Sequence, residues 1–227
     1  MRRTTFGGAL VALAIHLPSA PSLAMAATVR IIDGDTLAIG QETIRLHGID
    51  APEASQTCAR PGGGRWPCGR EAIRALERLA GAGPLSCTPL GKDAYDRTLA
   101  VCRSSGKDVN GAMVSSGLAW AFRKYAKDYV KAEEAAHAAG RGIWQAETEP
   151  AWTYRESRWT RAAQVHPSGC PIKGNLSGKD RIYHVPWSPW YDKTSVNEKK
   201  GERWFCSERE ALAAGWRAPA WGARRGD

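Results

Sequence analysis

The fold is decided by residues 28–49, which read TVRIIDGDTLAIGQETIRLHGI. Three short runs rich in β-branched and apolar residues alternate there with turn residues, as in a meander of antiparallel strands. The first turn is Asp33-Gly34, and the second contains Gly40. We therefore predict strands over the segments that flank these turns, namely Thr28–Ile32, Thr36–Ile39 and Thr43–Ile49.

The segments that follow predict two further strands and three helices. Ala72, Leu76 and Leu79 recur at helical spacing, which predicts an amphipathic helix over residues 69–80. The other elements are strands at Leu85–Leu90 and Thr98–Arg103, a helix capped by Asp108 and ended by Gly117, and a helix from about Tyr129 to Gly140. Five strands with a helix between the third and fourth favour a small Greek-key barrel over an alternating α/β sheet.

Composition excludes several classes of protein. The 227 residues are 43% hydrophobic and 24% charged, a balance that supports a packed core and excludes global disorder. No uninterrupted apolar run reaches the roughly 18 residues of a membrane-spanning helix, so we expect no membrane insertion. The formal net charge of +9 favours an acidic partner such as nucleic acid.

The first 26 residues are typical of a secretory signal peptide. A basic start at Arg2 and Arg3 precedes an apolar run at Gly7–Ile15, and Ala24-Met25-Ala26 provides a small-x-small cleavage site. An N-terminal core helix, which is the alternative, agrees less well with the basic start and the cleavage site. We therefore expect an exported protein, periplasmic or secreted, that is cut after Ala26.

Acidic and basic side chains cluster around the predicted barrel strands. Asp35 opens the second strand and Asp50 follows the third, so a hairpin is able to bring the two carboxylates together. Such a pair repels unless a cation lies between them, and oxygen-only ligands suit a hard ion such as Ca²⁺ or Mg²⁺. Glu53 is placed to activate a water, and Arg45 and Arg97 offer guanidinium groups that match phosphate oxygens. These groups together are what phosphodiester hydrolysis needs.

Each of these pieces has an ordinary structural reading when it is taken alone. Asp33-Gly34 is common turn chemistry, and the run Asp50-Ala51-Pro52-Glu53 is typical of a capped loop. Arg45 and Arg97 are typical of surface charges. Only their joint order and spacing favour a catalytic site over a set of turns and surface residues.

Four motifs resemble those of the thermonuclease, or staphylococcal nuclease-like, family over about residues 29–144. They are VRIIDGDTL at 29–37, IRLHGIDAPE at 44–53, DAYDR at 93–97 and GLAW at 117–120. The resemblance implies an OB-fold barrel and Ca²⁺-dependent hydrolysis of DNA and RNA.

The same resemblance implies roles for individual residues. Asp35 and Asp50 would be the calcium ligands, with the carbonyl of Ala51 as a third. Arg45 and Arg97 would hold the scissile phosphate and stabilise the charged transition state. The remaining roles fall to Glu53 as the general base, Asp33 beside the metal ligands, and Tyr95 and Tyr125 at the terminal phosphate and the nucleotide.

Three positions depart from the family pattern. Ala51 stands in place of a threonine, which leaves the backbone carbonyl unchanged. Asp96 stands where a glycine usually precedes the arginine, and its carboxylate is expected to weaken the phosphate contact of Arg97. Arg123 replaces a nucleotide-stacking tyrosine, so we expect a different base preference.

Six cysteines in an exported chain predict a disulfide framework, for which sequence alone permits 15 pairings. Cys87 and Cys102 lie on two predicted strands that flank one loop, and opposed residues of paired strands are close to disulfide reach. Cys58 and Cys68 bracket a short Gly-rich loop just after Glu53. We predict both pairs as disulfides. A zinc site is the alternative, although no C-x-x-C pair is present.

A compact, Trp-rich module begins near Cys170. Within it, Ser207 and Glu210 form a capping box for a short helix that Gly215 ends. The module resembles the metal-binding module of the Ada DNA-repair protein, with most of the zinc-binding cysteines lost. This resemblance implies that Cys170 and Cys206 form a disulfide in place of the metal site.

The chain is therefore expected to contain four parts. They are a signal peptide at 1–26, a nuclease OB-fold domain at 27–147, a helical linker at 148–168 and a small α+β module at 169–227. The leading hypothesis is an exported, monomeric nuclease that requires Ca²⁺ and acts on DNA and RNA. The alternatives are a non-catalytic nucleic-acid-binding OB-fold protein and a cell-surface or structural protein that functions through its Trp-rich tail.

Overall fold

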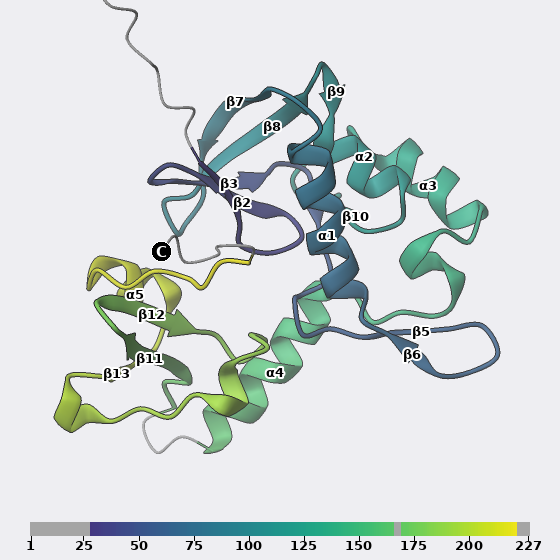
Figure 1. Cartoon of the computed structure of the whole chain (residues 1–227). Coiled ribbons are helices and arrows are strands. Elements are labelled where there is room, and N and C mark those ends of the chain that lie inside the picture. The colour runs from purple at the N-terminus through teal and green to yellow at the C-terminus, as the bar shows by residue number, and fades with distance from the viewer. Residues whose placement is uncertain (1–27, 166–168, 222–227) are drawn as a thin grey trace, which may run out of the picture.

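The computed structural model describes residues 28–165 and 169–221 (Figure 1). The expected signal peptide at 1–26 lies outside the described residues. Within these two ranges, no helix combines the length and the apolar character needed to cross a membrane.

One sheet contains all five strands that the sequence predicted. They are β1 (Val29–Ile31), β2 (Thr36–Ile39), β3 (Glu42–Leu46), β7 (Leu85–Lys92) and β8 (Thr98–Ser104), and the short β9 (Lys107–Asp108) pairs with β8. The order is β1-β2-β3-β8-β7. β3 and β8 are parallel, whereas the other neighbours are antiparallel. This is the strand order of an OB-like, β-rich fold.

The sheet stays open and does not close into the predicted barrel. In the part of the chain that is described, β1 and β7 are the two ends of the sheet path and do not pair with each other. The third strand also ends earlier than predicted, at Leu46, because Gly48 adopts a left-handed conformation with a φ of 76°. Beyond this turn, β4 (Ile49–Asp50) pairs with β10 (Trp120–Ala121). This change of partner places Asp50 in the interior.

Three helices complete the first domain, as the apolar spacing predicted. They are α1 (Cys68–Ala80), α2 (Val109–Ser115) and α3 (Val130–Ala138). α1 buries Ala72 and Leu76 in the same core as Leu37 of the sheet. Asp108 caps α2, since its Oδ1 accepts a hydrogen bond of 2.9 Å from the N–H of Gly111.

A long helix connects this domain to the C-terminal module. It is α4 (Ala151–Val165), and Figure 1 shows it running from the first domain toward the green and yellow module. Shorter elements precede it in the chain, namely the strand pair of β5 (Cys58–Ala59) and β6 (Arg65–Trp66) and the 3-10 helix η1 (Gly142–Gln145).

The C-terminal module is a small α+β unit with its own core. Its elements are β11 (Ile172–Ser177), β12 (Asp180–His184), η2 (Tyr191–Lys193), η3 (Glu198–Lys200), β13 (Arg203–Phe205) and α5 (Glu208–Ala213), with the sheet order β12-β11-β13. Ile172, Phe205 and Trp216 are buried together. Ser207 caps α5 as predicted, because its Oγ accepts the N–H of Glu210 over 3.1 Å.

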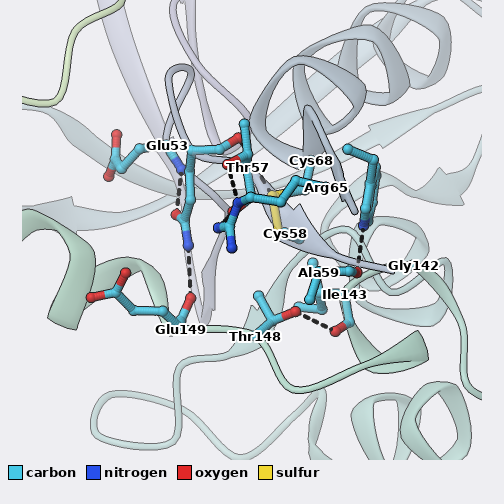
Figure 2. Close-up of a disulfide and its surroundings, with 12 residues drawn as sticks. Glu53, Thr57, Cys58, Ala59, Arg65, Cys68, Gly142, Ile143, Thr148 and Glu149 are labelled. Carbon is cyan, nitrogen blue, oxygen red and sulfur yellow. Dashed lines mark hydrogen bonds between the residues drawn. A yellow bond between two sulfur atoms is a disulfide. The ribbon is translucent and has the colours of Figure 1, made fainter. Parts of the chain in front are cut away.

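All three predicted disulfides are present. They join Cys58 to Cys68, Cys87 to Cys102 and Cys170 to Cys206. The second pair is directly opposed in the register of β7 and β8. Figure 2 shows the first pair, which ties β5 to the first residue of α1. Since no free cysteine remains, the alternative of a cysteine-ligated zinc site is excluded.

Candidate active site

Strand register brings Asp35 and Arg45 together. Thr36 of β2 is the antiparallel partner of Arg45 in β3, which places the Arg45 guanidinium beside the preceding residue, Asp35. Nη1 of Arg45 donates to Oδ1 of Asp35, and Nη2 donates to Oδ1 of Asp50 over 2.7 Å. One guanidinium therefore bridges the two carboxylates that the sequence marked as candidate calcium ligands.

Both carboxylates are buried and hydrogen-bonded. Asp35 is 2% exposed and Asp50 is 0% exposed. Oδ2 of Asp35 accepts the N–H of Ala51 over 2.8 Å, so the Ala51 backbone lies directly beside Asp35. Burial acts to raise the pKa of Asp50, but Arg45 and Arg155 hold it below its usual value. Such paired cations are what make a buried carboxylate tolerable.

Glu53 is held in place by its neighbours. Its N–H donates to Oε1 of Gln56 over 3.1 Å, and Nε2 of Gln56 donates to the carbonyl of Glu149 over 2.7 Å (Figure 2). The disulfide that begins at Cys58 tethers the same loop. Burial raises the pKa of the Glu53 carboxyl to about 7, against the lowering effect of Arg155. A carboxyl with a pKa near neutrality is suited to exchange protons.

Arg97 lies in the turn between β7 and β8, away from the hairpin that carries Asp35 and Arg45. Its Nε donates to Oδ2 of Asp93 over 2.7 Å, and Oδ1 of Asp93 accepts the N–H groups of Tyr95 and Arg97. Asp96, expected to disturb Arg97, instead adopts a left-handed φ of 61° and its carboxylate lies 3.7 Å from Nζ of Lys92. The acid bound to Arg97 is therefore Asp93, which also shapes the turn that presents it.

A cleft of about 970 Å³ joins these groups. Arg45, Glu53 and Arg97 line it together with Tyr95 and Tyr125. The two tyrosines are 38% and 63% exposed, so their rings are accessible from solvent. The structure thus brings five of the predicted site residues to the lining of one cleft. Asp35, Asp50 and Ala51 are buried outside this lining, and the two acids bind Arg45, which belongs to it.

The C-terminal module supplies part of the lining of the same cleft. Trp187 and Trp190 come from the loop after β12, and Glu208 comes from α5. Nε of Arg209 donates to the carbonyl of Ala94 over 3.0 Å, which ties the module to the turn that carries Arg97. The module is therefore part of the cleft and not a detached tail.

Arg155 is a further residue of the site, which no motif of the sequence predicted. Its Nη1 lies 2.5 Å from Oε1 of Glu53 and 3.1 Å from Oδ1 of Asp50, and its Nη2 lies 2.8 Å from Oδ2 of Asp50. The residue belongs to α4, 105 positions after Asp50 and 102 after Glu53, where the helical pattern predicts only a linker. A basic residue in a helix carries no local signal that could have revealed this contact.

The donor atoms in the site suit a hard cation. Asp35 and Asp50 offer carboxylate oxygens, which are the ligand type that Ca²⁺ prefers, whereas the Ala51 backbone faces Asp35 with its N–H. Over residues 28–165 and 169–221, no group of three or more His, Cys, Asp or Glu side chains is arranged to hold a metal. The two carboxylates would therefore need backbone and water oxygens to complete the coordination. Arg45 and Arg155 already neutralise the same carboxylates, which demonstrates that positive charge is favoured there.

Comparison with known proteins places these features in a family. Residues 43–146 match the family model described as staphylococcal nuclease homologue. An uncharacterized endonuclease of Haemophilus influenzae is 36% identical over 145 residues, which are 61% of this chain and 74% of the relative. The succinoglycan biosynthesis protein ExoI of Rhizobium meliloti is 35% identical over 160 residues, 69% of this chain and 84% of the relative. A micrococcal nuclease of Shigella flexneri is 29% identical over 169 residues, 66% of this chain and 91% of the relative.

The comparisons correct the expected identity of the C-terminal module. Residues 153–218 match the family model described as ArfC, and not a module of the Ada type. The expected disulfide between Cys170 and Cys206 is present, but it belongs to a module whose described residues hold no metal-binding cluster. The match begins inside α4, at residue 153, so Arg155 falls within it.

Proposed function

The chain belongs to the family of staphylococcal nuclease homologues, and we propose that it is an exported, Ca²⁺-dependent nuclease that cleaves DNA and RNA with little sequence preference. It is a nuclease, an enzyme that hydrolyses phosphodiester bonds. The observation that carries the finer proposal is the bridge that Arg45 makes between Asp35 and Asp50, in a cleft that Glu53 and Arg97 also line.

In this proposal Asp35, Asp50 and the carbonyl of Ala51 hold the calcium ion. When bound, the ion would neutralise charge on the phosphodiester. Arg45 and Arg97 bind the phosphate oxygens through their planar guanidinium groups and stabilise the negative charge of the transition state. The proposal leaves Asp33 beside the metal ligands, where burial raises its pKa although Arg45 and Arg97 oppose this rise.

Glu53 is the proposed general base. Its carboxylate accepts a proton from the attacking water, the new P–O bond forms, and the bond to the leaving oxygen breaks. The raised pKa of Glu53 favours this proton transfer near neutral pH. Tyr95 and Tyr125, on the wall of the cleft, are the proposed contacts to the terminal phosphate and the nucleotide.

Weak sequence preference follows from the chemistry of these groups. Guanidinium groups and a hard cation bind the phosphate backbone, which is the same for every base. The net charge of +9 adds a general attraction for polyanions. The guanidinium groups and the net charge therefore support a nuclease that recognises the phosphate backbone and not the bases.

A digest tests the proposal directly. Purified chain is incubated with plasmid DNA, single-stranded DNA or RNA, with CaCl₂ or with a chelator. We expect fragments from each substrate with CaCl₂ and none with the chelator. A salt-sensitive gel shift without fragments would instead indicate a non-catalytic binding protein. Cleavage that persists in the chelator would contradict the calcium requirement.

Export and the four-part division of the chain are also proposals. The three disulfides support an oxidising compartment. Cell fractionation, followed by sequencing of the mature N-terminus, is expected to find the protein outside the cytoplasm and to begin at Ala27. Light scattering is expected to give the mass of a single copy. A cytoplasmic protein that retains Met1 would contradict the proposed export.

A further inference from the structure

Arg155 reaches from α4 into the centre of the proposed cation site. Its guanidinium spans two carboxylates at once, binding Asp50 through both of its terminal nitrogens and Glu53 through Nη1. Its side chain is 24% exposed, whereas Asp50 is fully buried. The contact is therefore made below the surface of the cleft and is not a surface ion pair.

The contact leaves no oxygen of Asp50 without a cationic partner. Oδ1 accepts from Arg45 over 2.7 Å and from Arg155 over 3.1 Å, and Oδ2 accepts from Arg155 over 2.8 Å. A divalent cation that binds Asp50 must approach one of these oxygens. It would then lie within a few ångströms of the Arg155 guanidinium, where two positive charges repel strongly in a poorly solvated site.

α4 is bonded to the loop that carries Glu53, and these bonds set where the Arg155 side chain enters the site. Oγ of Ser55 lies 2.9 Å from the hydroxyl of Tyr154, the residue before Arg155, and donates to the carbonyl of Trp187 over 2.5 Å. These bonds join the first domain, α4 and the C-terminal module at one point. The position of Arg155 is thereby coupled to the position of the module.

We propose that Arg155 is a built-in cation that competes with the divalent metal for Asp50 and Glu53, so that metal binds only as Arg155 withdraws. The inference rests on the proposed cation site at Asp35 and Asp50. The inference adds a residue from the ArfC-like segment to that site. It also makes the affinity for the metal depend on the position of α4 relative to the first domain.

Calorimetric titration of the full chain with CaCl₂ tests this competition. The variants are Arg155→Ala, Arg155→Lys and the control Arg161→Ala. Arg161 is an exposed residue of α4 that donates to the carbonyl of Ser157 in the same helix. We expect Arg155→Ala to lower the dissociation constant for Ca²⁺ by at least about tenfold, since it removes the competing charge. Arg155→Lys keeps the charge but lacks the planar fork that binds Asp50 through two nitrogens, so its dissociation constant is expected to fall between those of the wild type and Arg155→Ala. The control is expected to match the wild type.

Thermal unfolding gives a second readout that does not depend on catalysis. Without metal, Arg155→Ala leaves the buried acids short of positive charge and is expected to melt lower than the wild type. Added CaCl₂ is expected to raise its melting temperature more than it raises that of the wild type. A merely structural arginine would give a loss of stability that Ca²⁺ does not restore. Should Arg155→Ala fail to fold, the lysine variant supplies the same comparison.

The outcomes separate this inference from the calcium proposal. If the wild type binds Ca²⁺, if Asp50→Asn abolishes binding and if the Arg155 variants bind no more tightly, the competition is refuted while the cation site stands. If only the Arg155 variants bind Ca²⁺, the competition is supported in its strongest form. If no variant binds Ca²⁺, both proposals are overturned.

Discussion

Gly69 of α1 packs directly against the backbone of Glu53. A Cβ atom placed on Gly69 would lie 1.7 Å from the carbonyl oxygen of Glu53 and 2.6 Å from its carbonyl carbon. The N–H of Gly69 also donates to the carbonyl of Gln56 over 3.2 Å. The start of α1 is thus in close backbone contact with the loop that carries the proposed general base, and only glycine allows this approach.

Gly69→Ala is expected to displace the Glu53 loop. Overpacking against backbone atoms destabilises a protein by roughly 1–3 kcal/mol, and the shift of Glu53 is expected to lower the rate of cleavage as well. Arg70→Ala, at an exposed position of the same helix, is the control and is expected to leave both unchanged. Urea unfolding and a timed digest measure the two effects. Wild-type stability of the Gly69→Ala variant would contradict the tight contact between Gly69 and Glu53.

Arg45→Ala is expected to lower turnover at least ~10²-fold. This is the typical effect of removing one hydrogen-bond donor to a charged transition state. The substitution also leaves Asp35 and Asp50 short of a partner, so a loss of about 3–5 kcal/mol of folding free energy is expected. Steady-state cleavage of a fluorescent oligonucleotide and denaturant unfolding report the two quantities. Arg74→Ala, which removes an exposed ion pair to Glu71, is the control.

Arg97→Ala separates catalysis from stability. Its turnover is expected to fall at least ~10²-fold, as for Arg45→Ala, because both side chains are proposed to bind the scissile phosphate. Its folding free energy is expected to change less, since the partner Asp93 is more exposed than Asp50 and is able to regain water. Unchanged cleavage by this variant would refute the proposed phosphate contact.

The C-terminal module is expected to lose stability between pH 6.5 and pH 4. Burial, assisted by the charge of Lys173, lowers the pKa of His184 from 6.5 to about 4. Below pH 6.5 the unfolded chain gains a proton that the folded chain does not accept until about pH 4, so acidification favours unfolding in this window.

Melting temperatures measured from pH 7 to pH 4 report this effect. Nε2 of His184 lies 3.1 Å from Oδ1 of Asn175, a contact that the amide of His184→Gln is able to keep without titrating. The glutamine variant is therefore expected to show a flatter decline than the wild type. Identical pH profiles for the two proteins would refute the assignment to His184.

Removal of a disulfide is expected to lower stability more when the loop that it closes is longer, with a logarithmic dependence on loop length. Cys170 and Cys206 are 36 positions apart, whereas Cys58 and Cys68 are 10 apart. In the chain-entropy model each bridge contributes about 2–4 kcal/mol, with more from the longer loop. Double serine variants, unfolded in urea, are expected to follow this order. An unshifted transition under reduction would contradict the stabilising role of the bridges.

Local features of the first domain could be predicted because neighbouring residues determine them. Alternating apolar residues and turn residues marked the strands that became β1, β2 and β3. The side chains of Asp108 and Ser207 cap α2 and α5 as their positions indicated. Asp35 and Arg45 lie on the two sides of the β2–β3 hairpin, so their meeting also depends on short-range geometry.

Longer-range features could not be predicted in the same way. Pairing of β4 with β10 joins residues about 70 positions apart and depends on how the segment after Gly48 packs. The carboxylate partner of Arg97 is Asp93 and not the adjacent Asp96, because a left-handed turn directs Asp96 toward Lys92. In both places the sequence supplies the residues, whereas the path of the backbone selects the partner.

By itself, the sequence determined the strands and the helix caps, because hydrogen bonding and apolar spacing act over a few residues. It also supplied the acid and guanidinium groups of the motifs. Only the tertiary structure decided that the C-terminal module lines the cleft and that Arg155 lies 2.5 Å from Glu53 across 102 positions of chain. A contact of that separation is specified by the packing of whole elements, which no local pattern encodes.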